Sequence, residues 1–228
     1  MTTTAWDDPE VREGMRRMLG LRSEHLGKGD RTIGWKLGFG SPFWLEKFRL
    51  DGPLVGFLPA SRRHESGAIV SCRGWVNPVA EPEIAVHLGR DVDNPALAAD
   101  AISGLGPAIE LADVDPPPED IGDVLAGNIF HRAVILGEPD PSRSAAAGMR
   151  ARITQGSSEV ADTTDLEILT GEIVSILGHA AALLQAAGET FHAGEVVIMG
   201  SVVPPIPVRP GDEITFELAP LLPISVRV

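Results

Sequence analysis

The chain has 228 residues, 43% of them hydrophobic and 22% charged, so it can bury a sizeable core in one large domain. Its formal net charge of −13 argues against a nucleic-acid partner, because binding to a phosphate backbone needs clustered lysine and arginine. The single cysteine, Cys72, excludes an internal disulfide and any cysteine-rich zinc or iron–sulfur site.

Membrane insertion and secretion are not expected from the sequence. The first twenty residues contain no apolar signal core, and no uninterrupted apolar run reaches the roughly 18 residues that a spanning helix needs. We therefore predict a cytoplasmic protein that has no membrane partner.

The first 30 residues predict an N-terminal helical segment, followed by a domain that spans residues 31–228. Asp7 or Asp8 can cap this helix, and Pro9 suits its first turn. Apolar residues recur at helical spacing and would form its buried face: Val11, Met15, Met18 and Leu19.

The remaining sequence predicts many strands and few helices. A short helix would run from Asn94-Pro95 to Ile102, and a long amphipathic helix over 172–187 would end at Gly188. Because strands and helices do not alternate, we predict a β-rich, mixed α+β fold and not a doubly wound sheet. The expected strands cover 32–38, 54–58, 79–88, 107–112, 195–199, 213–217 and 224–228.

The predicted strand 79–88 places two acids side by side. Successive side chains point to opposite faces of a strand, so Glu81 and Glu83 share one face while an apolar row fills the other. Two adjacent carboxylates repel each other unless a cation or a proton intervenes, and Mg²⁺ and Mn²⁺ prefer such oxygen ligands. From the pattern alone, a metal site and a solvent-facing strand surface both remain open.

A third acid, Glu110, lies between Ile109 and Leu111 in an otherwise apolar strand. A carboxylate in such a strand is costly unless it is paired. On another strand, Lys36 is flanked by Gly34 and Gly38, which we expect to leave room for a ligand to approach the lysine.

Several of these segments together resemble one protein family. The sequences GWKLG at 34–38, EPEIAVHLGR at 81–90 and AIELA at 108–112 stand in the order typical of 2-keto-4-pentenoate hydratases. These enzymes form a branch of the fumarylacetoacetate hydrolase superfamily. The sequences AGEVVIMGS at 193–201 and PGD at 210–212 follow the same order, and the resemblance extends over roughly residues 30–228.

The resemblance implies a metal site, a catalytic lysine and a fold. It implies that Glu81, Glu83 and Glu110 bind one Mg²⁺ or Mn²⁺, and that Lys36 is a catalytic residue. It also implies a β-rich domain wrapped around a mixed, rolled sheet with a few flanking helices, usually assembled into homo-oligomers. Apolar segments such as 202–207 would favour such an assembly, because they are unusually apolar for a monomer surface.

Five further residues are candidates for substrate binding, each with a structural alternative. His131 can bind substrate or be a satisfied structural histidine, and Arg132 can pair with a substrate carboxylate or be solvated. Asn128 precedes them in the same segment, which lies near the substrate in the family. Gly200 and Ser201 can offer backbone N–H groups to a ligand or form a bend at a strand end.

The chain departs from the family pattern at two places. Where hydratases of this branch often carry Pro-Asp-Phe-Gly, this chain has Leu54 in place of the acid. Where many members carry Leu-Gly-His-Pro before the long helix, residues 169–172 read LTGE. Both departures lie outside the three carboxylates, so the metal site is the firmer expectation.

The expected function is that of a metal-dependent lyase whose partner is a small anionic 2-oxo acid or its enol. The metal would stabilise the negative charge of an enolate, and Lys36 would move a proton during hydration of a 2-hydroxydienoate or 2-oxo-4-enoate. Hydrolysis or decarboxylation of acylpyruvate-type acids is an alternative, because both use the same enolate. A non-catalytic metal- or ligand-binding relative is a third possibility, which Leu54 favours.

Overall fold

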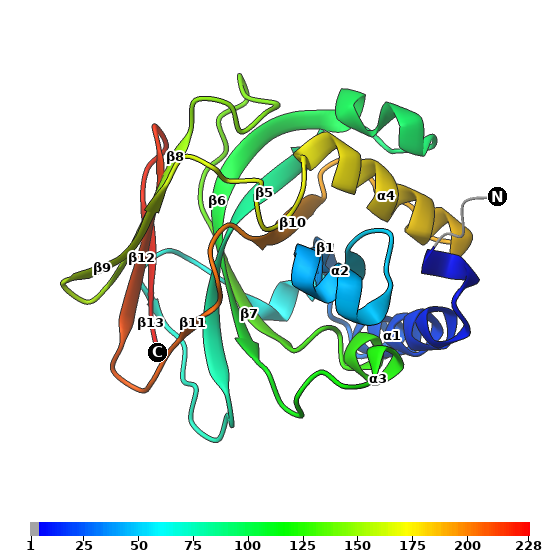
Figure 1. Ribbon diagram of the computed structural model, residues 1–228, viewed down its shortest axis with the longest axis horizontal. Helices are drawn as coiled ribbons and strands as arrows, with labels where there is room; N and C mark the ends of the chain where they lie inside the picture. The colour runs from blue at the N-terminus through cyan, green and yellow to red at the C-terminus, as the bar shows by residue number, and fades with distance from the viewer. Residues whose placement is uncertain (1–4) are drawn as a thin grey trace.

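The computed structural model describes residues 5–228, and its centre is a curled, mixed sheet that forms a half-barrel (Figure 1). In spatial order its strands are β2 (Leu54–Pro59), β1 (Thr32–Gly38), β10 (Val196–Ser201), β5 (Pro78–Leu88), β6 (Ile102–Asp113), β7 (His131–Leu136) and β3 (Arg63–His64), with β11 (Ile206–Pro207) paired to β5. β1 pairs with β10, and β3 with β7, in parallel, while the other neighbours are antiparallel.

A second, smaller sheet packs against the strands β6 and β7 of the first. Its residues alternate between a buried face, which includes Ile153, Ile214 and Phe216, and an outer face that carries ion pairs such as Arg150–Asp162. Its strands in spatial order are β4 (Ala68–Ile69), β13 (Ile224–Arg227), β12 (Glu213–Ala219), β8 (Arg150–Gln155) and β9 (Ser158–Thr163).

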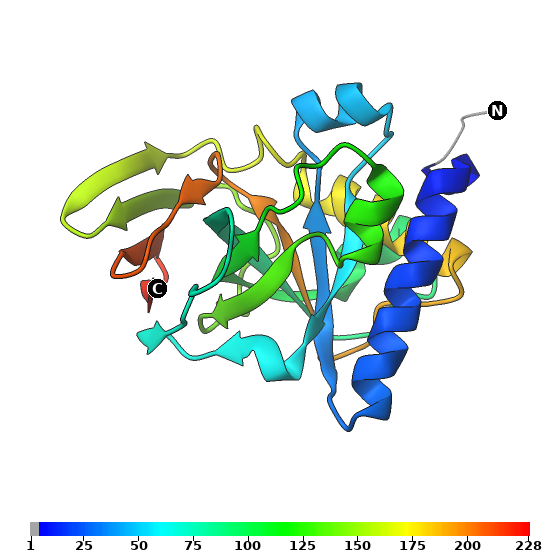
Figure 2. The same ribbon diagram turned by 90° about the horizontal axis from the view of Figure 1, so that it is seen from below.

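Helices cover the outside of the half-barrel. α1 (Pro9–Gly27) packs on α3 (Ile121–Ala126) and β2, while α4 (Ile173–Ala186) packs on β2 and β10. The short α2 (Pro42–Phe48) stands at the end of β1 and has no buried residue (Figure 2). Three 3-10 helices complete the described chain: Ala5–Asp7, Ala60–Arg62 and Pro95–Ala101. Within residues 5–228, no helix is long and apolar enough to cross a membrane.

The predicted α+β fold with a mixed, rolled sheet is confirmed, and each expected strand and helix is present. Asp8 is the residue that caps α1, because its carboxylate accepts a hydrogen bond from the Glu10 N–H at 2.8 Å. The proposed division at residue 30 stays a prediction. We did not predict α2 and α3, which are too short for a helical periodicity, the strands β7, β8 and β9, or the two-residue strands β3, β4 and β11.

The two faces of β5 contribute to two different cores. Ala80, Ile84 and Val86 join the large outer core beneath the helices and the second sheet. The opposite face of β5 points into the half-barrel, where Ala85 belongs to a small inner core. That inner core also contains Leu58, Ala108, Val134, Leu136, Val196 and Ile198. Glu81 and Glu83 therefore lie on the inner, concave face of the sheet.

A side chain hydrogen-bonds to the outer edge of strand β2. The Asn128 amide accepts a hydrogen bond from the Phe57 N–H at 2.8 Å and donates one to the Phe57 carbonyl at 2.9 Å. Both bonds are buried, so the amide replaces the neighbouring strand that β2 lacks on this side. Asn128 begins a left-handed turn in which Asn128, Ile129 and Phe130 have φ values of 56°, 50° and 62°. For Ile129, a β-branched residue, this conformation is strained.

We predict that Asn128→Ala lowers the free energy of unfolding by about 1–3 kcal/mol, because it leaves a buried donor and a buried acceptor on Phe57 without partners. Urea denaturation followed by circular dichroism would measure this change. Asn77→Ala is the control, since Asn77 is exposed and its amide makes only a 3.4 Å bond to the Val114 carbonyl. Equal stability losses in the two variants would contradict the role assigned to Asn128.

Candidate active site

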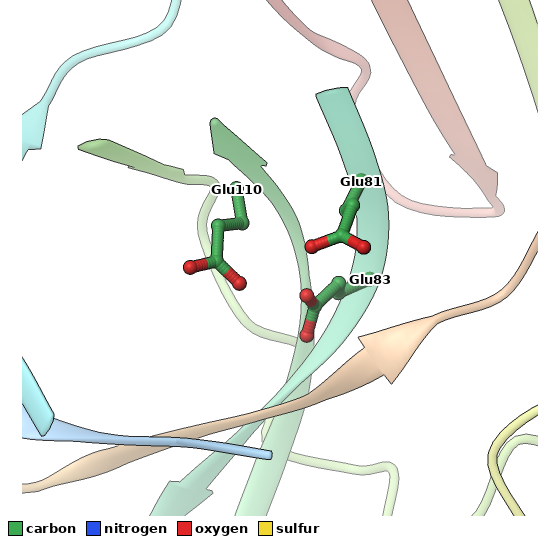
Figure 3. Close-up of side chains that lie close together, drawn as sticks. All are labelled: Glu81, Glu83 and Glu110. Carbon is green, nitrogen blue, oxygen red and sulfur yellow. The ribbon is translucent and has the colours of Figure 1, made fainter. Parts of the chain in front are cut away.

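Three carboxylates converge on the concave face of the half-barrel. Glu81 on β5 is the direct cross-strand partner of Glu110 on β6, and Glu83 lies two residues further along β5. One oxygen from each carboxylate lies within 4.8 Å of the others (Figure 3). The structure therefore brings together the three residues that the sequence singled out as metal ligands.

Two oxygens of this group are buried without a hydrogen-bond partner. Glu83 and Glu110 are 1% and 0% exposed, while Glu81 is half-buried at the wall of a cavity. Glu83 Oε1 and Glu110 Oε2 find no partner among residues 5–228. Buried carboxylate oxygens are costly when nothing compensates them, and a hard divalent cation accepts this donor set. The residues present thus fit a divalent metal ion.

Without a cation, the three acids differ in how readily they ionise. Burial, and after it the charge of Glu110, raises the pKa of Glu81 to about 7. The same two effects raise the pKa of Glu83 well above its ordinary value. Burial also acts upward on Glu110, but the Lys36 ammonium and His131 outweigh it and hold the pKa of Glu110 below its ordinary value. Glu110 is therefore the acid whose ionised form is most favoured when no metal is bound.

Lys36 forms a buried ion pair with Glu110. Its Nζ lies 2.5 Å from Glu110 Oε1 and 3.0 Å from the Ile129 carbonyl oxygen, and the residue is 1% exposed. The strained turn at Ile129 thus supplies the second acceptor for the ammonium. Lys36 also contributes to the wall of the cavity that Glu81 and Glu83 line.

The glycines beside Lys36 serve a different purpose from the one expected. A Cβ at Gly34 would lie 1.8 Å from the Val196 carbonyl oxygen, and one at Gly38 would lie 2.9 Å from Ile129 Cγ2. Neighbouring protein atoms therefore occupy the space beside Gly34, whereas Gly38 lies against Ile129 and also lines the cavity. Room for the lysine comes instead from Gly56 on β2, where a Cβ would lie 3.1 Å from Lys36 Cγ.

His131 lies behind the carboxylates and is not part of the cavity wall. Its Nδ1 is 2.7 Å from Glu110 Oε1, the oxygen that Lys36 also contacts. Burial lowers the pKa of His131, so the ring is neutral and its Nδ1–H donates to the carboxylate. His131 and Lys36 together occupy Oε1 and leave Oε2 facing the other two acids. The histidine is thus placed to orient Glu110.

The other substrate-binding candidates are dispersed. Both polar groups of the Asn128 amide are bonded to Phe57, and the Arg132 guanidinium lies 3.5 Å from Asp113. Neither side chain lines the cavity. Gly200 and Ser201 do line it, but the Gly200 N–H donates to Glu83 Oε2 at 2.6 Å.

The Gly200 contact depends on a bulge in the sheet. The register between β10 and β5 shifts between Ile198 and Ser201, and Gly200 adopts a φ of 94°. This irregularity turns the N–H of Gly200 out of the strand ladder and toward Glu83. Its function is to hold a carboxylate, which the sequence alone did not indicate.

The cavity has a volume of about 440 Å³ and an apolar wall. Sequence reasoning missed most of this wall, including the aromatic residues Phe39 and Trp44 and the neighbouring Leu169. The available signal was the aromatic-rich segment at 39–48, which directly follows the lysine strand. The site therefore combines a charged floor with apolar sides.

Comparisons with known proteins concern the family and the fold of this chain. A family model described as Fumarylacetoacetate (FAA) hydrolase C-terminal matches residues 47–228, which include the three carboxylates but not Lys36. The chain is 29% identical over 205 residues to a 2-hydroxyhexa-2,4-dienoate hydratase of Comamonas testosteroni, covering 86% of this chain and 76% of that protein. It is 25% identical over 229 residues to a 4-oxalocrotonate decarboxylase of a Pseudomonas species, covering 97% and 88%.

A solved structure shares the fold. The 4-oxalocrotonate decarboxylase from Pseudomonas putida G7, complexed with magnesium and adipate, matches with a TM-score of 0.86 and 22% sequence identity. The match covers 99% of this chain and 86% of that one.

We predict that the three carboxylates bind one Mg²⁺ or Mn²⁺ and that Glu83→Ala weakens this binding by about 100-fold or more. Even a residue that only hydrogen-bonds to a metal ligand typically contributes about 10–100-fold to metal affinity. Calorimetric titration would measure both affinities. His87→Gln is the control, because His87 lies further along the same face of β5 and outside the carboxylate group. Equal affinities for wild type and Glu83→Ala would contradict the assignment.

A pH dependence of stability follows from the raised pKa of Glu81. Its pKa is about 7 in the folded protein and 4.5 ordinarily, so folding favours the neutral acid. This contribution to stability is complete below about pH 4.5 and is lost as the pH rises through about 7. With a chelator present, the free energy of unfolding of the wild type should fall relative to Glu81→Gln between pH 5 and pH 8, and urea denaturation would measure it.

The control for this measurement is Glu65→Gln, whose carboxylate is 84% exposed. Its stability difference from the wild type should stay constant over the same range. A constant difference for Glu81→Gln as well would contradict the raised pKa.

Proposed function

The chain belongs to the fumarylacetoacetate hydrolase family, and from this premise we propose that it is a metal-dependent hydro-lyase. Its substrate would be a small anionic 2-oxo acid or its enol, and its reaction the hydration of a 2-hydroxydienoate or 2-oxo-4-enoate. The observation that carries the proposal is the convergence of Glu81, Glu83 and Glu110, with two unpartnered buried oxygens, beside Lys36 at the floor of a cavity.

The proposed cofactor is Mg²⁺ or Mn²⁺, held by the three carboxylates. The magnesium complex of the decarboxylase that shares this fold supports that choice. Once bound, the cation would supply a Lewis acid for the carboxylate and the 2-oxo group of the substrate. Its positive charge would also attract an anionic substrate into a protein of net charge −13.

The remaining roles fall to the side chains. In the hydration of a 2-hydroxydienoate, the enol oxygen loses a proton and the far end of the conjugated chain gains one before water adds. Lys36 Nζ, between Glu110 and the cavity, is placed to exchange a proton at the oxygen-bearing end of the substrate. Glu110 and the Ile129 carbonyl hold the ammonium in position, and His131 orients Glu110.

Decarboxylation is the second candidate, and a specific observation supports it. The decarboxylase relative aligns with 97% of the chain, against 86% for the hydratase relative, although the identity is lower. Hydrolysis of a carbon–carbon bond has less support, because it would use an acid–histidine pair facing the cavity to activate water. His131, the histidine beside Glu110, does not line the cavity.

A non-catalytic binding protein also has less support than the sequence suggested. Leu54, which replaces the acid usual in the family, is 0% exposed and packs in the outer core. Because its side chain does not line the cavity, the substitution removes no charge from the cavity wall of this chain.

We further propose that the protein forms a homo-oligomer in the cytoplasm. Segment 202–207, which we expected to support the assembly, does not do so, because Val202, Val203 and Ile206 are buried within the chain. Exposed apolar side chains elsewhere support it, among them Ile69, Val76 and Leu222, which are 71%, 70% and 79% exposed.

Turnover of 2-hydroxypenta-2,4-dienoate with Mg²⁺ or Mn²⁺ tests the proposal, with 4-oxalocrotonate as the substrate for the alternative. We predict that Lys36→Met lowers kcat by about 100-fold or more, the usual scale for a positioned acid–base group, while metal affinity persists. Lys36→Arg should restore little activity if proton transfer is the role, because a guanidinium keeps its proton in proteins.

The outcomes separate the candidate roles. Full activity in Lys36→Arg would make the residue an electrostatic anchor, and an unchanged kcat in Lys36→Met would remove it from the mechanism. If the metal-loaded wild type turns over neither substrate, the lyase proposal fails. Lys28→Met is a matched control, since Lys28 is an exposed lysine outside the cavity wall.

A further inference from the structure

We propose that the cavity selects 2-oxo acids with a single carboxylate and an apolar tail, and discriminates against 2-oxo acids that carry a second carboxylate at the far end. This inference rests on the proposed function, because it assumes that the 2-oxo acid end of the substrate binds at the three carboxylates. It goes further by assigning the chemistry of the tail.

The composition of the cavity wall is the first argument. Its charged groups belong to three lining residues that lie close together, Lys36, Glu81 and Glu83. The rest of the wall is mainly apolar and includes aromatic and aliphatic side chains: Phe39, Trp44, Leu169, Met199 and Val203. Burying an apolar tail against such a wall is favourable in proportion to the area removed from water.

The position of the cations is the second argument. Lys36 is the one cationic side chain in the wall, within the part of the chain that the structure describes, and it is already paired with Glu110. The other polar side chains of the wall are neutral, namely those of Ser41, Asn77, Thr170 and Ser201. A second carboxylate on the tail would thus lose its water without gaining a charged partner.

A further cation, Lys47, contacts two residues of the cavity wall, Trp44 and Pro118, from outside the cavity. Its Nζ donates to the Pro118 carbonyl at 3.1 Å and lies 4.9 Å from the centre of the Trp44 ring. It also lies 5.2 Å from the Phe48 ring, and it does not line the cavity. Lys47 therefore fastens α2 to the segment around Pro118 and leaves the interior of the cavity uncharged.

Trp44 is held in the wall by other aromatic rings. It stacks on Phe48 with an interplanar angle of 11° at 5.7 Å, and its ring lies 4.9 Å from that of Phe39. α2, which carries Trp44, stands at the end of β1 (Figure 2) and has no buried residue of its own. The function of this helix in the fold is to present an aromatic wall to the cavity.

The size of the cavity agrees with a longer tail. Its volume of about 440 Å³ lies within the roughly 300–1,000 Å³ typical of small-molecule sites. A five-carbon acid would fill only part of it, so additional methylene groups should find apolar surface to cover.

The test measures binding of stable 2-oxo acids to the Mg²⁺-loaded protein by calorimetry. Affinity should rise from pyruvate through 2-oxobutanoate and 2-oxohexanoate to 2-oxooctanoate, by about three- to fourfold for each buried methylene. The decisive pair is 2-oxohexanoate and 2-oxoadipate, which have equal chain length and differ in the second carboxylate. We expect 2-oxoadipate to bind about tenfold more weakly, or worse, because its terminal charge is desolvated without a partner.

Two variants test whether the aromatic wall causes the rise in affinity with tail length. Trp44→Ala should reduce the gain in affinity from 2-oxobutanoate to 2-oxooctanoate by about tenfold, because the tail loses apolar surface to cover. Leu97→Ala should leave the gain unchanged and is the control, since Leu97 is 56% exposed and does not line the cavity.

The results distinguish failure of this inference from failure of the proposed function. If pyruvate binds but affinity does not rise with tail length, or if 2-oxoadipate binds as tightly as 2-oxohexanoate, the inference is overturned and the function stands. Loss of tight 2-oxoadipate binding in Lys47→Met would then identify Lys47 as the group that recognises the second carboxylate. If no 2-oxo acid binds in the presence of Mg²⁺, the proposed function fails and this inference fails with it.

Discussion

The buried ion pair between Lys36 and Glu110 is the interaction on which the arrangement of the site depends. Lys36 is on β1 and Glu110 on β6, and β10 and β5 lie between these strands in the sheet. In a flat sheet the two strands would be roughly 14 Å apart, three spacings of about 4.8 Å. Their side chains meet only because the sheet curls, so the pair spans the concave side of the half-barrel. Removing either partner would leave a buried charge uncompensated.

The ion pair also determines how the carboxylates share the site. Lys36 and His131 both contact Oε1 of Glu110, which leaves Oε2 directed at Glu81 and Glu83. Glu110 is thus stabilised as an anion, whereas burial and its charge disfavour ionisation of the other two acids. A divalent cation would reverse this balance for Glu81 and Glu83, since it favours the ionised form of all three. The metal-free protein therefore holds the ligands together at an energetic cost that metal binding relieves.

Strained and irregular backbone surrounds this charged group. The left-handed turn at 128–130 directs the Ile129 carbonyl toward Lys36, and the bulge in β10 directs the Gly200 N–H toward Glu83. Regular strands would have used these groups in the sheet ladder. The wall beside them is largely apolar, and electrostatic interactions are stronger next to apolar surroundings than in water. The fold thus surrounds a small set of charges with fixed dipoles and apolar side chains.

The sequence determined the long helices, half of the strands and the identity of the acids. Alternation along 79–88 is a local property, and it places Glu81 and Glu83 on one face of β5. The apolar neighbours of Glu110 likewise marked it as a buried acid. The contacts of Lys36, His131, Asn128 and Gly200 were decided only by the tertiary structure. The Lys36 contact joins strands that are not neighbours, and the other contacts depend on the turn at 128–130 or on the bulge in β10. The alternation of side chains along a strand predicts neither the curling of the sheet nor these irregularities. The glycines beside Lys36 illustrate this limit. A glycine in a strand indicates that another group comes close to its backbone, but whether this group is a ligand or the protein itself depends on how the sheet curls.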